Sequence, residues 1–343
     1  MRRTGSAGTR SGASAARCDV ARRGISASAA MLVALATTGC ASRSTQAEVI
    51  RTLRQMSLTS QDFSFVRARY AGSYEERREW EKLLEWARGR SRRGADAATR
   101  LITRQALPAP ITTPASCFGD EACDWVLRTE AAASSIPTWT EFAAAWEQAK
   151  PAVHGALRLA QAERQDASQG VDQELKARLR TDQSLRAALQ ATQPRLGDAG
   201  RALYRLAIGM AVTRADHDNT RWLKALIAKQ GWPRPPSVSR QAEEAAWVMT
   251  LHARHDPAFR IAALQAMLAA GASPAAHAVR LDHVLSETFG LQRYGTKGEC
   301  SNGRFVPVPT EDQEGLEERR RAVGLPSSAE QIRIMEPACE AFP

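Results

Sequence analysis

The sequence predicts a mainly α-helical protein with one small β-hairpin near its C-terminus. Apolar residues recur at helical spacing through most of the chain beyond residue 75. Gly, Pro and Ser clusters separate these stretches at intervals typical of helices. Near the C-terminus, the turn signal Cys-Ser-Asn-Gly lies between LQRYGT and RFVPVP, which predicts a hairpin within residues 290–309.

The first residues have the pattern of an export signal. Residues 1–24 contain six arginines and one acid, and a short apolar run follows at 25–36. The run is too short to span a bilayer, which takes about 20 apolar residues, and small residues then precede Cys40. We therefore predict a signal peptide over residues 1–39. Its end resembles the bacterial lipobox, whose cysteine is lipidated, although Thr37 replaces the usual leucine. The alternative is ordinary cleavage that leaves Cys40 free.

This start predicts a periplasm-facing protein anchored by a lipid on Cys40, with the outer membrane as the favoured location. Residues 40–50 are small and polar, as expected of a tether. The chain carries a net charge of +10, but half of that excess lies in residues 1–39. No basic stripe interleaved with aromatic residues remains, so we expect no nucleic-acid partner.

Four cysteines remain once Cys18 and Cys40 are set aside. An even number in an exported chain favours disulfides. Cys117 and Cys123 bound a small loop, and Cys300 and Cys339 would close a loop contributing about 3–4 kcal/mol. The C-x5-C spacing without neighbouring histidines does not fit zinc.

The first half is predicted as a helical N-terminal region over residues 51–165. Helices are expected at three stretches, with a proline-rich loop before the second. Thr138 is a plausible N-cap with Glu141 three positions on, and Pro151 is expected to kink or divide the third helix. The stretches are 75–105, 121–134 and 138–164.

The second half is predicted as a C-terminal helical domain over residues 171–343, beyond a polar linker at 165–170. The hairpin follows its fifth helix, and a last helix from about residue 311 ends at Gly324, which fits a C-cap. The first five helices are expected at 172–192, 197–229, 240–254, 257–270 and 275–289.

Residues 171–336 resemble a bacterial domain family of unknown function, through short motifs that are specific only in their order and spacing. The motifs are Asp182-Gln183-x-x-Arg186, Asp216-x-x-Asn219, Gly231-Trp232-Pro233, Ala245-Ala246-Trp247, His252-Ala253, Asp256-Pro257, Asp282, Gln292-x-Tyr294-Gly295-Thr296, Arg320 and Gly324-Leu325. Two positions depart from the family pattern, with Lys297 replacing a glutamine and His283 an arginine. The resemblance implies a shared fold and no known activity.

Polar residues within these motifs are the candidate site. His252 with Asp282 is the candidate catalytic pair, since a carboxylate orients a general-base histidine. Ligand contacts are expected from Asp182, Arg186, Asp216, Asn219, Gln292, Tyr294 and Thr296. The last three alternate along a segment taken as extended, so they would share one face. The structural alternative makes the histidine a core residue, the acids helix caps and the last segment a strand entering a turn.

Other chemistry is not indicated. His252 and His255 are spaced H-x2-H without the glutamate of the zinc motif, so no metal is predicted. Nucleophile and phosphate-loop motifs are absent, and no cofactor is expected.

Two functions are weighed, and a purely structural role in the envelope is a third possibility. The first, slightly favoured, is a binding lipoprotein with a periplasmic protein partner, of which an immunity protein is one version. The second is a hydrolase or transferase that uses the His–Asp site. The enzyme requires His252 within hydrogen-bond reach of Asp282 or Asp216 in a partly open pocket, with the hairpin residues at its rim. The binding protein requires an exposed apolar patch rimmed by polar groups.

Overall fold

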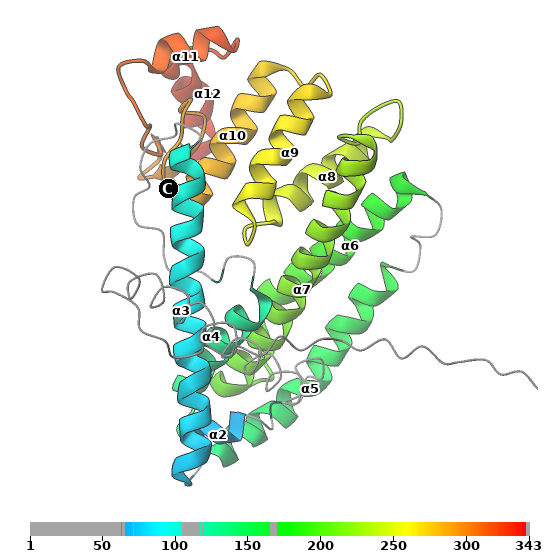
Figure 1. Ribbon diagram of the computed structural model, residues 1–343, viewed down its shortest axis with the longest axis vertical. Coiled ribbons are helices and arrows are strands. Elements are labelled where there is room, and N and C mark those ends of the chain that lie inside the picture. The colour runs from blue at the N-terminus through cyan, green and yellow to red at the C-terminus, as the bar shows by residue number, and fades with distance from the viewer. Residues whose placement is uncertain are drawn as a thin grey trace, which may run out of the picture. The chain divides into compact units, whose positions relative to one another are not determined.

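The computed structural model describes residues 63, 66–70, 72–104, 117, 120–164 and 170–340. These residues form eleven helices and one antiparallel hairpin, which confirms the mainly α fold (Figure 1). The predicted signal peptide, Cys40, the tether and most of the linker lie outside the described residues. The elements are α2 (Arg67–Tyr70), α3 (Tyr74–Arg104), α4 (Glu121–Ser134), α5 (Trp139–Ala162), α6 (Val171–Gln190), α7 (Asp198–Gln230), α8 (Arg240–His252), α9 (Pro257–Ala269), α10 (Pro274–Phe289), β1 (Gly298–Ser301), β2 (Arg304–Pro307), α11 (Leu316–Ala322) and α12 (Ser328–Glu340).

Local signals set most helix starts where they were predicted. Each of the eight helices predicted between residues 75 and 289 has a counterpart in α3 to α10. Thr138 accepts a hydrogen bond from the backbone N–H of Glu141, and its own backbone N–H donates to the carboxylate of Glu141, which completes the predicted capping box. Asp256 caps α9 by accepting from the backbone N–H of Phe259. Helix α5 continues through Pro151, so that proline does not divide it.

The C-terminal end differs from the prediction in two helices. Helix α11 starts at Leu316 because Asp312 holds residues 312–315 in a turn, accepting from the backbone N–H groups of Glu314 and Gly315. Helix α12 was not predicted. Its first turn is capped by Ser327, and Pro337 inside it masks the helical signal.

The hairpin and both disulfides are confirmed. Strands β1 and β2 pair in antiparallel register, and Asn302 and Gly303 take the positive φ angles of a tight turn. Cys300 in β1 is bonded to Cys339 in α12, which packs on β2. Cys117 is bonded to Cys123 in the first turn of α4.

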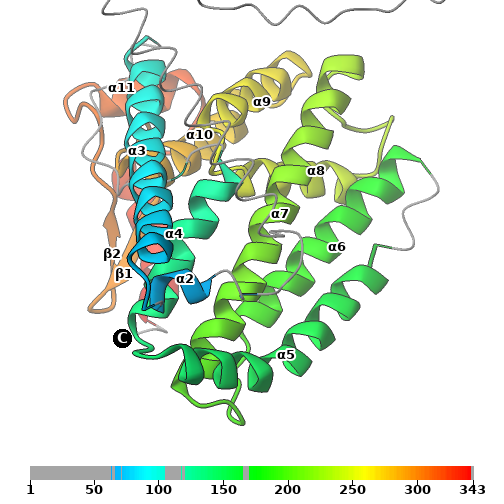
Figure 2. The ribbon, with the colours of Figure 1, turned by 60° about the horizontal axis from the view of Figure 1, so that its bottom comes forward.

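Helices from both halves of the sequence pack together. Helices α5, α6 and α7 lie against one another, and α4 also contacts α7 (Figure 2). The boundary predicted near residue 170 therefore lies inside one compact unit, residues 53–343. A core formed by α6 to α10 surrounds Leu175, Leu223, Trp247 and Leu264. Among the described helices, none has an apolar stretch that could cross a membrane.

Candidate functional site

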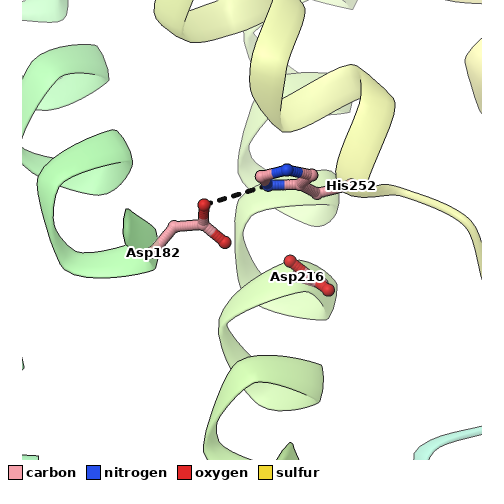
Figure 3. Close-up of side chains that lie close together, drawn as sticks. All are labelled: Asp182, Asp216 and His252. Atoms are coloured by element: carbon pink, nitrogen blue, oxygen red, sulfur yellow. Dashed lines mark ion pairs between the residues drawn. The ribbon is translucent and has the colours of Figure 1, made fainter. Parts of the chain in front are cut away.

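Three helices bring polar side chains to one place. Helix α6 contributes Asp182 and Arg186, one turn apart on the same face. Helix α7 contributes Asp216 from its middle. Helix α8 ends at His252, so its imidazole lies at the start of the turn that leads to α9. Figure 3 shows Asp182, Asp216 and His252 converging from these three helices.

His252 pairs with Asp182. Its Nδ1 atom lies 2.9 Å from Oδ2 of Asp182, an ion-pair distance, although this contact is not aligned as a hydrogen bond. The same oxygen accepts from Nε2 of Gln183 at 3.0 Å. The Asp182 side chain is 1% exposed and that of His252 is 20% exposed, so the carboxylate is enclosed while the imidazole reaches the surface of a cleft.

Arg186 connects the two carboxyl groups. Its Nε donates to Oδ1 of Asp182 at 2.9 Å, and its Nη2 donates to Oδ1 of Asp216 at 2.6 Å. One guanidinium therefore holds one oxygen of each carboxyl group. The other oxygen of Asp182, Oδ2, faces His252, and one potential ligand atom from each of Asp182, Asp216 and His252 lies within 4.8 Å of the other two.

The two carboxyl groups differ in protonation. Burial raises the pKa of Asp216 to about 7, and the charge of Asp182 adds to that rise, while Arg186 opposes it. Burial also acts to raise the pKa of Asp182, but His252 and Arg186 outweigh it, so the pKa of Asp182 falls below its ordinary value. At neutral pH the site therefore combines a carboxylate with a carboxyl group that can hold a proton, a pattern typical of acid–base sites.

A cleft of about 430 Å³ opens beside this cluster. That volume is within the usual range for small-molecule sites. Helices α4, α6, α7, α9 and α10 and the α8–α9 turn form its walls. Its charged and imidazole-bearing residues are Asp124, Arg128, Arg186, Asp216, His217, His252, Arg254, His255, Arg260 and Glu287.

A metal ion is one conceivable occupant of the cluster. Asp182, Asp216 and His252 are the one group in the described chain whose potential ligand atoms all lie within 4.8 Å of one another. Oxygen and imidazole ligands of this kind suit zinc or manganese. However, Arg186 already places a fixed positive charge on both carboxyl groups. The site is thus balanced in charge by the protein itself.

Asp282 is not the partner of His252. It is completely buried, and its two oxygens accept four hydrogen bonds from the segment 293–296. The donors are the backbone N–H groups of Arg293, Tyr294 and Thr296 and the hydroxyl of Thr296. The prediction of a His252–Asp282 pair was wrong because sequence order does not reveal which of several carboxylates a histidine meets across a helical core.

The segment with Gln292, Tyr294 and Thr296 is a bend rather than an extended strand. Gly295 has a positive φ, which breaks the alternation that would put the three side chains on one face. Gln292 donates to the carbonyls of Lys297 and Val308 and accepts from the N–H of Lys297. Lys297 therefore meets Gln292 only through its backbone. None of the described cleft-lining residues comes from this segment.

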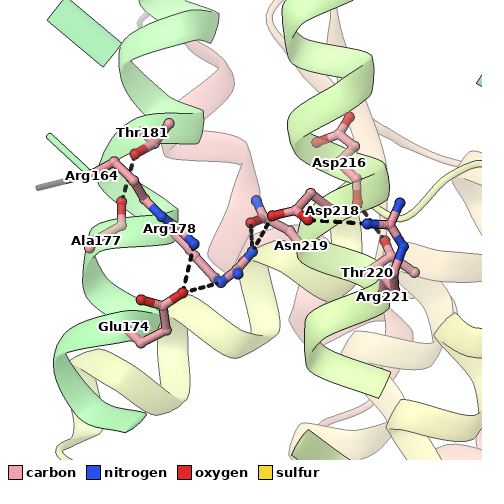
Figure 4. A network of polar contacts seen from close by, with 10 residues as sticks. All are labelled: Arg164, Glu174, Ala177, Arg178, Thr181, Asp216, Asp218, Asn219, Thr220 and Arg221. Atoms are coloured by element: carbon pink, nitrogen blue, oxygen red, sulfur yellow. Dashed lines mark hydrogen bonds and ion pairs between the residues drawn. The ribbon is translucent and has the colours of Figure 1, made fainter. Parts of the chain in front are cut away.

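Asn219 also lies away from the cleft. It shares with Asp216 the face of α7 that meets α6, as their spacing predicts, but its Oδ1 accepts from Nη1 of Arg178 at 3.0 Å. Arg178, which is nearly buried, also bonds Glu174 and Asp218 at 2.7 Å each (Figure 4). This network joins α6 to α7 and is structural.

Several cleft residues were not among the predicted site residues. The rings of His217 and His255 stack with their centroids 3.8 Å apart. His217 directly follows Asp216, and His255 lies three positions after His252. Burial lowers the pKa of both rings, that of His255 to about 4. No local sequence pattern marks Arg254, Arg260 or Glu287 as site residues. Their ion pairs form only because the α8–α9 turn and α9 pack on α10.

Comparison with known proteins gives a family and nothing more. No curated protein and no solved structure matches the chain. Residues 169–341, which include α6 to α12 and so the whole Asp182–Asp216–His252 cluster, match the family of unknown function DUF6624. With half of its length matched, the chain belongs to the DUF6624 family.

Proposed function

We propose that this chain is an exported, lipid-anchored envelope protein whose cleft performs acid–base catalysis, as a hydrolase or a transferase. One observation carries the catalytic part: His252, oriented by the buried Asp182, lies beside Asp216 at the edge of an open cleft. Each of these groups is of a type used for proton transfer in enzymes.

The geometry supports a division of roles. Asp182 lies against Nδ1 of the imidazole at 2.9 Å, which leaves Nε2 to take a proton from an attacking water or hydroxyl. The attacking oxygen then bonds to the substrate, and the bond to the leaving group breaks. Asp216, with a pKa near 7, gives its proton to that leaving group. The proton gained by His252 afterwards passes to Asp216, directly or by exchange with solvent, which restores both groups.

The function that the sequence slightly favoured, a binding protein with a periplasmic partner, has less support. It requires a contiguous apolar surface. Within the described chain, the large apolar side chains that are most exposed come one each from α3, α5, α9, α10, β2 and α12: Tyr74, Leu159, Leu268, Val279, Val306 and Ile334. The cleft, in contrast, supports the enzyme in part, because His252 and Asp216 line it together, whereas none of Gln292, Tyr294 and Thr296 is among its described lining residues.

Export and lipidation remain proposals drawn from the first forty residues. The two disulfides support them, because such bonds persist in oxidising compartments. Metabolic labelling with a fatty acid, followed by membrane fractionation, tests the anchor. The parent should be labelled and sediment with membranes, and C40S should be unlabelled. A labelled C40S variant would contradict lipidation at this residue.

Catalysis is tested with the C40S protein and a panel of chromogenic esters, amides, phosphoesters and glycosides. We expect hydrolysis of at least one class, with loss of about 100-fold or more in H252Q and D216N. N219D is the matched control, because Asn219 lies on α7 near Asp216 but outside the cleft. Turnover that persists in both H252Q and D216N would contradict the proposed roles.

A further inference from the structure

We infer that the same cleft binds an oxyanion group of its substrate, a phosphoryl or a carboxylate group, at a subsite formed by Arg254, Arg260 and Thr288. All three residues line the cleft together with His252 and Asp216. This inference rests on the proposed function, since it names the substrate class of the same site.

The subsite has an excess of positive charge. Glu287 is the one carboxylate that Arg254 and Arg260 share, with Oε1 2.7 Å from Nη2 of Arg254 and Oε2 2.7 Å from Nη2 of Arg260. His283 also contacts Glu287, at 3.2 Å. One negative charge therefore faces two guanidinium groups. An anionic ligand would balance the charge of the second guanidinium group.

Hydrogen-bond donors remain for that ligand. Arg254 is 70% exposed and reaches Glu287 with Nη2, which leaves Nη1 and Nε for a ligand in the cleft. The hydroxyl oxygen of Thr288 accepts from Nη1 of Arg260 at 3.2 Å, so its own proton can be donated elsewhere. Arg260 is 1% exposed, and its contacts with Glu287 and Thr288 fix it in the wall.

The position of Arg254 joins this subsite to the reactive groups. Helix α8 ends at His252, and the chain turns through Ala253 so that Arg254 and His255 face the same cleft. A substrate held by its anionic group at Arg254 would therefore lie beside His252. The cleft volume of about 430 Å³ suits a small molecule or the end of a larger one.

The inference is tested by anion binding to the C40S protein, with sodium phosphate and sodium acetate as probes. Binding is followed by calorimetry at constant ionic strength set with sodium chloride. We expect R254Q to bind the effective anion about tenfold more weakly, as expected for the loss of one charge-assisted contact. R221Q is the control, because Arg221 is 75% exposed, pairs with an aspartate and lies outside the cleft.

The outcomes are distinct. Binding of phosphate assigns a phosphoryl-bearing substrate, and binding of acetate alone assigns a carboxylate. No binding of either anion, or equal binding by R254Q and the parent, would overturn the subsite. H252Q should still bind the anion, since it keeps Arg254, Arg260 and Thr288. Anion binding by H252Q and a lack of turnover in the parent would therefore overturn catalysis and leave the subsite standing.

Discussion

Nδ1 of His252 lies 2.9 Å from Oδ2 of Asp182, and this contact joins the end of α8 to the middle of α6. Arg186, one turn beyond Asp182, extends the connection to Asp216 on α7. The cluster thus lies where three helices of the family region meet. Asp282 of α10, in contrast, accepts hydrogen bonds from the bend at residues 293–296. These two kinds of polar site should respond differently to substitution.

Asp282 should matter for folding and His252 should not. D282N replaces one of two buried oxygens, which together accept four hydrogen bonds, with an NH2 group that cannot accept from the facing N–H donors, so we expect a loss of about 2–4 kcal/mol. H252Q should change the free energy of unfolding by less than about 1 kcal/mol. Urea unfolding of both variants measures this. Equal destabilisation would mean that His252 is a structural residue.

Asp216 should make stability depend on pH. Its pKa is about 7 in the folded protein against an ordinary 3.8, so the folded state holds the proton more tightly. The stability that Asp216 contributes to the folded state is fully present below pH 3.8 and is lost as the pH rises through 7. The stability of D216N relative to the parent should therefore increase by about 2 kcal/mol between pH 5 and 8. Thermal unfolding across that range measures it, and a constant difference would refute it.

His255 should act in the opposite sense. Burial lowers its pKa from 6.5 to about 4, so the unfolded chain binds a proton more readily than the folded one. The stability that the neutral His255 ring contributes to the folded state is present above pH 6.5 and is lost as the pH falls through 4. The parent should thus lose stability relative to H255Q on acidification from pH 7 to 4. Parallel melting curves for the two proteins over this range would show that the ring is not held neutral.

The longer disulfide should stabilise the C-terminal end. Cys300 and Cys339 are 39 positions apart, and the chain-entropy relation gives about 4 kcal/mol for closing such a loop. The C300S/C339S double variant should lose stability by that order in urea unfolding. The double variant C117S/C123S, which opens a much shorter loop, should lose about 2 kcal/mol. The opposite ranking would contradict the loop-length argument.

The sequence predicted the helices well because their signals are local. Capping at Thr138 and Asp256, and apolar spacing within each stretch, act over a few residues. Helix α12 was missed because Pro337 lies within it. The bend at 291–297 was misread as extended, since its shape depends on Gly295 and on a buried acid from α10.

Some of the residues named from the sequence lie together in the structure, but not in the pairing that was predicted. Asp182, Arg186, Asp216 and His252 were all named from the sequence, yet the histidine was matched with Asp282. Partners across a helical bundle depend on how helices pack, and a single sequence does not contain that information in any local pattern. The same reason explains why Arg254 and Arg260, brought together by Glu287 of α10, were not found.

Under the proposed mechanism, Asp216 carries a proton beside the oriented imidazole of His252. Carboxyl carbon NMR of the C40S protein, titrated from pH 3 to 9 with D216N for assignment, tests it directly. We predict that the Asp216 carboxyl titrates near pH 7, and that D182N lowers this pKa by removing a neighbouring negative charge. A pKa at or below the ordinary 3.8 would contradict the account, because Asp216 would then be an ionised partner of Arg186 with no proton to give.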